Sequence, residues 1–284
     1  MRVVTVRYAG EERWGVLDPE GGFRLAPRPP EAPATVLDHL DEGVPLRPGD
    51  DWESVPLEDA TLLAPIPVPR RNVICMGLNY ADHAEESMRA KGREVVLPEH
   101  PVVFTKATTS VTGPDSEIVL EPDVTEQMDW EVELALVMGR GGRHIAAADA
   151  LQHVFGYTII NDLSARDLQF RHKQFFLGKS LDSACPMGPW ITTVDEVEDP
   201  QALDIRCRVN GEMKQEANTS LMIFGIARTI EILSGILRLQ PGDIIATGTP
   251  AGVGFARTPP QYLRPGDRVE CEIAGLGVLR NYFI

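Results

Sequence analysis

The sequence predicts an α+β fold, with a small β-rich N-terminal domain followed by a larger domain of mixed strands and helices. Apolar runs of strand length recur along the chain, while only a few segments carry apolar residues at helical spacing. The stretch Ala64-Pro65-Ile66-Pro67-Val68-Pro69 suits neither a helix nor a central strand, because its alternate prolines lack a backbone donor. We therefore expect one domain over residues 1–68 and a second over residues 69–284.

The N-terminal part contains two strand patterns and one helix pattern. Residues 3–8 and 13–17 are strand-like, and the turn-forming Gly10-Glu11-Glu12 lies between them. Residues 34–40 are compatible with a short helix after a proline-rich segment. No group of residues in this part suggests catalysis.

Beyond the connector, apolar runs bounded by turn residues alternate with helical segments. Strands are predicted over residues 72–76, 102–106, 117–120, 129–139 and 155–161. Helices are predicted over residues 81–90, 146–154, 164–172 and 220–237. In the third of these helices Ser164 and Asp167 form a capping-box-like pattern, and the fourth carries one apolar stripe typical of burial. Similar Pro-Gly turns at 240–243 and 264–267 each lead into a strand.

Composition and charge disfavour several classes of protein. Hydrophobic residues make up 43% of the 284-residue chain and charged residues 24%, which is ordinary for a soluble globular protein. With 42 acidic against 27 basic residues the net charge is -15, so we expect neither nucleic acid nor a membrane as a partner. The four cysteines lie far apart and are expected to be reduced core thiols. Neither a signal-peptide pattern nor a membrane-spanning run is present, so we expect a cytoplasmic protein.

Two glutamates lie on one face of the strand predicted at 129–139. Successive side chains of a strand point to opposite faces, so Glu131 and Glu133 share a face with Ala135 and Val137. One interpretation is the solvated face of a half-buried sheet. The apolar continuation of the face instead indicates partial burial, where two like charges need compensation. A hard divalent cation is the simplest compensation, and it requires a third acidic ligand.

Asp162 is the candidate for that third ligand. It lies at the end of one predicted strand and the start of a predicted helix, where small-ligand sites often gather. On position alone, the favoured interpretation of Asp162 is a helix N-cap. Arg166 and Gln169 follow four and seven residues later, on the same face of the predicted helix. An acid, a cation and an amide on one face suit an anionic ligand held beside a metal.

His83 and Glu86 form a candidate catalytic pair in the helix predicted over 81–90. At a spacing of three residues the carboxylate can orient the imidazole and raise its basicity. The alternative is an ordinary solvated pair on a helix surface. The following residues 87–98 are charged and contain glycine, which suits a mobile lid.

These residues fall within six motifs that together resemble the fumarylacetoacetate hydrolase family, in particular its acylpyruvases and 2-hydroxyhepta-2,4-diene-1,7-dioate isomerases. The motifs occur in the family's order over residues 72–284. They are Asn79-Tyr80 with His83 and Glu86, Phe104-x-Lys106, Glu131-x-Glu133, Asn161-Asp162-x-Ser164-Ala165-Arg166-Asp167-x-Gln169, Gly178-Lys179-Ser180-x-Asp182 with Pro186-x-Gly188-Pro189, and Thr247-Gly248-Thr249-Pro250-x-Gly252-Val253-Gly254. The N-terminal segment resembles the small extra domain that many members carry.

The resemblance implies a fold, a metal and roles for the site residues. The fold would be a mixed β-roll with flanking helices, its catalytic domain spanning residues 69–284, and the protein would be a homodimer. Mg2+ or Mn2+ would be held by Glu131, Glu133 and Asp162, with open positions for a small anionic 2-oxo acid. The implied roles of the other residues are enolate stabilisation by Lys179, substrate binding by Arg166, Gln169, Thr249 and Gly248, and water activation by His83 with Glu86.

The expected function is divalent-metal-dependent cleavage of a C–C bond in a 2-oxo or 2,4-dioxo acid. This includes acylpyruvate-type hydrolysis and oxaloacetate-type decarboxylation, because both pass through an enolate that a metal stabilises. The pair of His83 and Glu86 favours hydrolysis. One alternative is an isomerase or decarboxylase of 2-hydroxy-diene dicarboxylates in aromatic catabolism. A more distant alternative is a ligand-binding module without enzymatic activity.

Overall fold

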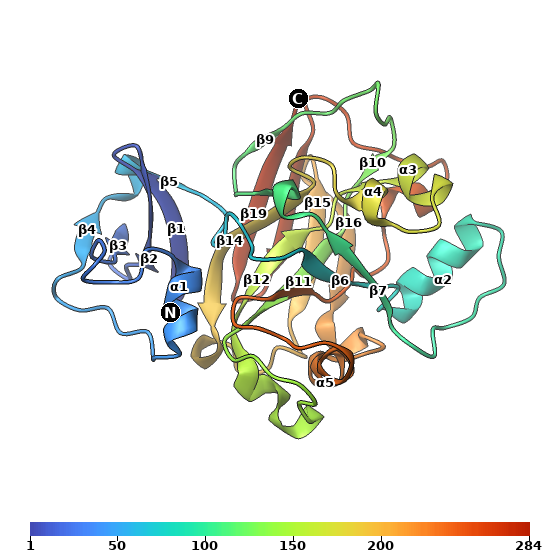
Figure 1. The fold of residues 1–284 in the computed structure, drawn as a ribbon. Helices are drawn as coiled ribbons and strands as arrows, with labels where there is room; N and C mark the ends of the chain where they lie inside the picture. Colours follow the sequence, from blue (N-terminus) through green and yellow to red (C-terminus); the bar gives the residue numbers. More distant parts are fainter.

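Strands dominate the fold of the computed structural model, which describes residues 1–284 (Figure 1). The main path of the large sheet runs in the order β4-β3-β2-β1-β14-β12-β11-β17-β6-β7, and β5 and β8 pair with β1 and β14 beside it. A second sheet has the order β16-β15-β18-β19-β9, and β10 pairs with β13 as a separate ribbon. Five short α-helices lie around the sheets, so the predicted α+β class is confirmed.

The predicted strands are found close to their expected positions. The strands of the large sheet are β1 Arg2–Tyr8, β2 Glu11–Leu17, β3 Phe23–Leu25, β4 Glu53–Val55, β5 Ala60–Leu62, β6 Val73–Gly77, β7 Val102–Lys106, β8 Val111–Thr112, β11 Val132–Met138, β12 Val154–Asn161, β14 Cys185–Thr193 and β17 Ile244–Ala246. The remaining strands are β9 Glu117–Ile118, β10 Met128–Asp129, β13 Ser164–Ala165, β15 Asp204–Val209, β16 Glu212–Asn218, β18 Arg268–Ile273 and β19 Gly277–Phe283.

The stretch 129–139 is interrupted and does not form the single strand expected. Strand β10 ends at Asp129 and β11 begins at Val132, so Trp130 and Glu131 lie at a break. Side chains replace the ladder bonds there, because the backbone N–H of Trp130 donates to Oδ1 of Asp129 at 2.8 Å and that of Glu131 donates to Oδ1 of Asn161 at 3.1 Å. Glu131 therefore lies in the break itself, and Glu133 lies in β11 just after it.

Strand β11 is buried on both faces and separates two hydrophobic cores. Val132, Leu134 and Leu136 pack in the larger core with residues of the second sheet. Ala135 and Val137 pack in another core with residues of β6, β17 and the N-terminal part. The predicted alternation is confirmed, and the face that carries the two glutamates is buried, not solvated.

The N-terminal strands lie beside the main body, at the blue end of the colour scale (Figure 1). Strand β1 pairs with β14 through Arg2 and Val3, so the large sheet continues across both parts of the chain. Residues 64–69 form neither helix nor strand, as expected from their prolines. The domain boundary at residue 68 stays a prediction.

Two of the predicted helices are found and three need correction. The helices are α1 Val36–Glu42, α2 Ala81–Ala90, α3 Arg166–Arg171, α4 Phe176–Lys179 and α5 Ile226–Ile236. Residues 147–153 form a 3-10 helix instead of an α-helix, and α5 starts later than predicted because Thr219–Leu221 forms a separate 3-10 turn. The capping-box prediction is wrong, since Ser164 and Ala165 form β13 and pair with β10 before α3 begins.

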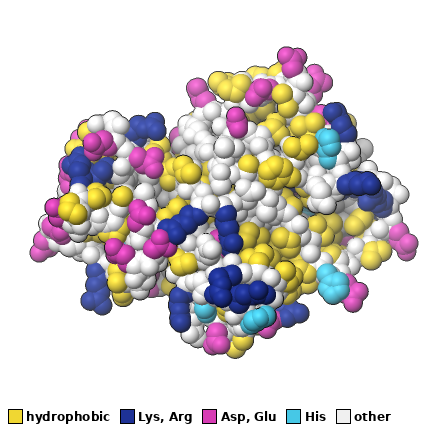
Figure 2. All heavy atoms as spheres, in the orientation of Figure 1, with side chains coloured by type: hydrophobic (Ala, Val, Ile, Leu, Met, Phe, Trp, Pro, Cys, Tyr) yellow, Lys and Arg dark blue, Asp and Glu magenta, His cyan; other side chains and the backbone are white.

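All four cysteines are free and buried, which agrees with their predicted place in the core. None of the helices combines the length and apolar character that crossing a membrane requires. On the face drawn in Figure 2, acidic side chains are spread over most of the outline, so the negative charge is not confined to one patch.

Candidate active site

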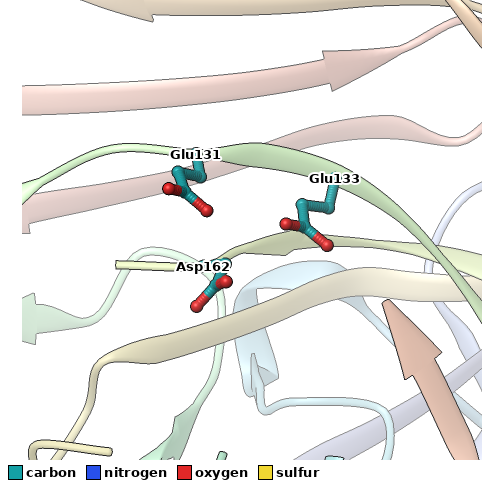
Figure 3. A group of neighbouring side chains, drawn as sticks. All are labelled: Glu131, Glu133 and Asp162. Atoms are coloured by element: carbon teal, nitrogen blue, oxygen red, sulfur yellow. The ribbon is translucent and has the colours of Figure 1, made fainter. Parts of the chain in front are cut away.

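Three carboxylates meet at the interrupted start of β11. Glu131 and Glu133 extend from this segment, and Asp162 follows the end of β12, the neighbouring strand (Figure 3). The backbone N–H of Asp162 donates to the Glu131 carbonyl at 2.8 Å and holds the two segments in register. One oxygen from each carboxylate lies within 4.8 Å of the others, and all three residues are buried. The three predicted acids therefore converge.

Two lysines contact this acid cluster. Nζ of Lys179, in α4, lies 2.7 Å from Oε2 of Glu131 and 2.6 Å from Oδ2 of Asp162. Nζ of Lys106, at the end of β7, donates to Oδ1 of Asp162 at 2.5 Å and to the Leu163 carbonyl at 3.0 Å. Burial alone would lower the pKa of Lys179, but Asp162 and Glu131 outweigh it and raise that pKa. Lys179 therefore keeps its positive charge inside the site.

Arg166 links the cluster to a fourth buried carboxylate. Its Nε donates to Oδ2 of Asp129 at 2.8 Å, its Nη1 donates to Oε1 of Gln169 at 3.0 Å, and its Nη2 forms an ion pair with Oε1 of Glu131 at 2.7 Å. Asp129 also accepts the backbone N–H groups of Gly254 and Phe255, at 2.7 Å and 3.0 Å. The guanidinium is thus fixed by groups from residues 129–131 and from its own helix α3.

Glu133 is the member of the cluster without a basic partner. Glu131 and Asp162 make ion pairs with lysine or arginine, whereas Glu133 accepts only the backbone N–H of Gly248, at 2.8 Å. Burial, together with repulsion from Asp162 and Glu131, raises the pKa of Glu133 well above its usual value. Ionisation of all three acids therefore requires a further positive charge. A hard divalent cation fits this set of oxygen donors, as predicted for Mg2+ or Mn2+.

The helix α2 carries the predicted base. Nδ1 of His83 lies 2.9 Å from Oε1 of Glu86, which fixes the proton on Nδ1 and leaves Nε2 as an acceptor. Glu86 also accepts the backbone N–H of Gly252, at 3.1 Å and 3.0 Å to its two oxygens. The side chain of His83 is 7% exposed, so the pair is not the solvated surface pair of the alternative interpretation.

The loop after β17 supplies backbone groups to the site. Gly248 has a φ of +96°, and a Cβ there would lie 2.8 Å from Cβ of Asn79, so only glycine fits. The Thr249 hydroxyl donates to the Val132 carbonyl at 2.9 Å and accepts a hydrogen bond from Nε2 of Gln215 at 2.7 Å. Thr249 therefore lies at the cavity with its hydroxyl proton already engaged.

A small cavity lies between α2 and the acid cluster. Its volume is about 40 Å3, room for no more than a few water molecules. The residues that line it are Met76, Gly77, Leu78, His83, Ser87, Lys91, Phe104, Glu131, Glu133, Arg166, Gln169, Phe175, Lys179 and Thr249. A larger cavity of about 300 Å3 lies near Arg13 and Trp14, away from these groups.

Comparison with known proteins assigns the family. A model of the fumarylacetoacetate (FAA) hydrolase C-terminal family matches residues 72–284. The chain belongs to the fumarylacetoacetate hydrolase family. It is 50% identical over 237 residues to the oxaloacetate tautomerase YisK of Bacillus subtilis, an alignment that covers 83% of this chain and 77% of the relative. The chain is therefore an enzyme of this family.

Two solved structures show how far the resemblance extends. A fumarylacetoacetate hydrolase from psychrophilic Exiguobacterium antarcticum has a TM-score of 0.87 at 40% identity, covering 100% of this chain and 99% of the other. The 2-hydroxyhepta-2,4-diene-1,7-dioate isomerase from Mycobacterium marinum has a TM-score of 0.77 at 33% identity, covering 100% of this chain and 98% of the other. Both comparisons extend over the N-terminal part as well as the part that the family model matches.

The fumarylacetoacetate hydrolase motifs come together around the cavity. Every site residue predicted from the sequence either lines the cavity or bonds to a residue that does, and the assigned roles stay predictions. The prediction that Asp162 shares a helix face with Arg166 and Gln169 is wrong, because α3 begins only at Arg166. The side chains meet at one cavity nevertheless, since Arg166 and Gln169 line it and Asp162 bonds to Lys179, which also lines it.

Sequence reasoning missed two buried members of the site. Lys106 lies in one of the family motifs, but the sequence indicates no role for it, and Asp129 stands out only as part of the strand predicted at 129–139. The signal for Lys106 is its place in the sequence Val-Val-Phe-Thr-Lys, where one charged residue ends a strand of otherwise apolar or hydroxyl-bearing residues. Both residues are fully buried and ion-paired in the structure.

Proposed function

We propose that this enzyme catalyses keto–enol tautomerisation of a 2-oxo dicarboxylic acid of the oxaloacetate class. The reaction breaks a C–H bond at C3, forms an O–H bond at the 2-oxo oxygen, and leaves every C–C bond in place. The proposal rests on a basic histidine and a buried lysine that face one cavity beside three carboxylates. The name of the Bacillus subtilis relative, an oxaloacetate tautomerase, supports this choice of substrate.

The buried groups would bind and polarise the substrate. A divalent cation held by Glu131, Glu133 and Asp162 would act as a Lewis acid toward the 2-oxo group. Arg166 is held rigidly by Asp129 and Gln169, so its position is set before the substrate enters. Lys179 lies between Glu131 and Asp162, where its ammonium can stabilise negative charge that develops on the substrate oxygen.

His83 would move the proton. Its Nδ1 donates to Glu86, so Nε2 is the atom available to accept a proton from C3. Glu86 stabilises the imidazolium that results, because its carboxylate stays within hydrogen-bond distance of Nδ1. His83 would then deliver this proton from Nε2 to the 2-oxo oxygen to give the enol. The reverse reaction would carry the proton from the enol O–H back to C3 through the same nitrogen, so no activated water is required.

The lid must open for this reaction to occur. A cavity of about 40 Å3 is smaller than a four-carbon diacid, so part of its lining would have to move to admit the substrate. Helix α2 and Lys91, which follows its last residue, close one side of the cavity, and His83, Ser87 and Lys91 line that side. We call α2 with Lys91 the lid helix. Movement of this helix would admit the substrate and then exclude water from the proton transfer.

A second candidate is an isomerase of 2-hydroxy-diene dicarboxylates. The similarity to the Mycobacterium marinum isomerase favours it, because that protein acts on a dicarboxylate whose isomerisation also requires proton transfer through an enol. The expected hydrolysis and decarboxylation would use the same enolate and stay predictions. These reactions differ in whether a C–C bond breaks.

An ultraviolet assay separates the candidates. Enol-oxaloacetate added to purified enzyme with Mg2+ should lose its ultraviolet absorbance faster than the uncatalysed rate, without formation of pyruvate. Excess chelator should abolish the acceleration. Formation of pyruvate would indicate decarboxylation, loss of an acylpyruvate chromophore would indicate hydrolysis, and turnover of a 2-hydroxy-diene dioate alone would favour the second candidate.

A further inference from the structure

Lys91 is the cation of the cavity that has no carboxylate partner. Three basic side chains other than histidine line the cavity, namely Lys91, Arg166 and Lys179. Arg166 is paired with Asp129 and Glu131, and Lys179 is paired with Glu131 and Asp162. Lys91 takes part in none of these ion pairs, and the contacts of its ammonium are with the rings of Phe170 and Phe255. Its charge is therefore available to an anion that enters.

Aromatic rings position Lys91 without neutralising it. Nζ lies 4.5 Å from the ring centroid of Phe170 and 5.5 Å from that of Phe255. The two rings pack edge to face with their centroids 5.2 Å apart, and Arg166 also lies over Phe255, at 4.5 Å. Cation–π contacts hold an ammonium in place but leave its donors free for a carboxylate.

The surroundings of Lys91 also favour an incoming anion. Lys91 follows the last residue of α2, at the exposed end of the helix and the edge of the cavity. Partial burial, with repulsion from Arg166 and Arg93, lowers the pKa of Lys91 to about 8. A carboxylate bound beside the ammonium would offset the burial and the repulsion, and it would raise the pKa of Lys91 again.

We infer that Lys91 binds the distal carboxylate of a dicarboxylic substrate and makes the enzyme specific for 2-oxo diacids. The inference rests on the proposed function, which places the 2-oxo end of the substrate at the acid cluster. The far carboxylate then points away from Lys179, toward the mouth of the cavity where Lys91 lies. Because Lys91 ends the lid helix, binding of this carboxylate would also favour the closed site.

The test compares oxaloacetate with its 4-methyl ester, which has nearly the same shape but no distal charge. In Lys91→Met the KM for oxaloacetate should rise about 10-fold to 100-fold, the usual effect of one charged hydrogen bond, while the KM for the ester stays unchanged. Lys91→Arg should keep most of the preference, because it retains the charge. Arg89→Met removes an exposed cation of α2 that pairs with Glu85 and does not line the cavity, so it should change neither KM.

Two results would overturn the inference. One is an equal rise of KM for both compounds in Lys91→Met, and the other is a wild-type enzyme that does not distinguish the diacid from the ester. If the wild-type enzyme tautomerises neither compound, the proposed function fails. Titration calorimetry of the same two compounds with Mg2+ would then still test whether Lys91 binds the distal carboxylate. A Lys91→Met protein that binds oxaloacetate as tightly as wild type would then refute its role.

Discussion

Both carboxylate oxygens of Glu86 accept the backbone N–H of Gly252, at 3.1 Å and 3.0 Å, so the lid helix is fastened to the loop that follows β17. The same carboxylate lies 2.9 Å from Nδ1 of His83. Closure of the lid and orientation of the imidazole therefore depend on one side chain. A Cβ on Gly252 would lie 2.1 Å from the Lys214 carbonyl, so this approach of the backbone requires glycine.

Glu86→Gln should impair turnover more than stability. Glutamine keeps one oxygen acceptor but cannot stabilise an imidazolium, so we expect kcat to fall about 100-fold, the lower end of general-base effects. The matched control is Glu85→Gln, the neighbouring lid residue, whose carboxylate binds the exposed Arg89 at 2.9 Å. Steady-state kinetics and thermal unfolding of both variants provide the measurement. Equal losses of kcat in the two variants would contradict the assigned role of Glu86.

Glu131, just before β11, and Glu133, in β11, should respond differently to neutralisation. Glu131→Gln breaks ion pairs with Arg166 and Lys179, so the metal-free protein should lose about 3–5 kcal/mol of unfolding free energy. Glu133→Gln replaces a carboxyl group that has no basic partner and whose pKa is raised well above its usual value, so the metal-free protein should keep its stability. Both variants should lose the rise in melting temperature that Mg2+ gives the wild type. Chemical unfolding in chelator, and thermal unfolding with Mg2+, measure these effects. Equal destabilisation of both variants in chelator would contradict this account.

Local sequence patterns were sufficient for the elements whose periodicity is clear. Helix α2 has the predicted bounds, and strand alternation places Glu131 and Glu133 on one face because its period is two. The ribbon of β10 and β13 was not predictable, because pairing between distant segments overrides the capping tendency of Ser164. Local sequence could indicate which side chains share a face, but not what covers that face.

The ion pairs of the site also lay beyond local reasoning. Lys106 and Asp162 are 56 residues apart in sequence, and Asp129 and Arg166 are 37 apart. Such pairs form only when the fold brings together β7, the ribbon of β10 and β13, and the end of β12, so no spacing rule identifies them. Strand alternation and the position of Asp162 indicated the three acids, and the family resemblance added Lys179. Homodimerisation and a cytoplasmic location stay predictions.

Stability should depend on pH through His39, in helix α1. This residue is 5% exposed, its ring centroid lies 5.2 Å from that of Trp14, and Nε2 has no hydrogen-bond partner. Burial lowers the pKa of His39 below its usual value near 6.5. The unfolded chain therefore takes up a proton at a higher pH than the folded chain, and stability falls as pH drops below about 6.5.

The matched experiment compares wild type with His39→Leu in chemical unfolding between pH 8 and pH 5. At pH 8 both histidine states are neutral and the comparison gives the packing effect alone. On acidification the wild type should lose more unfolding free energy than the variant, because only the wild type has this proton to take up on unfolding. Parallel curves for the two proteins would refute the linkage.

Lys106 should stabilise the protein when metal is absent and weaken metal binding when it is present. Its Nζ contacts Asp162 in a fully buried position, so Lys106→Met leaves that carboxylate with Lys179 alone and should cost about 3–5 kcal/mol in chelator. The carboxylate that loses a cation attracts another more strongly, so Mg2+ should raise the melting temperature of Lys106→Met more than that of wild type. Lys214→Met is the control, because Lys214 is also buried but pairs with the exposed Glu212, outside the acid cluster. A Mg2+ response in Lys106→Met no larger than in wild type would show that Lys106 acts only on packing.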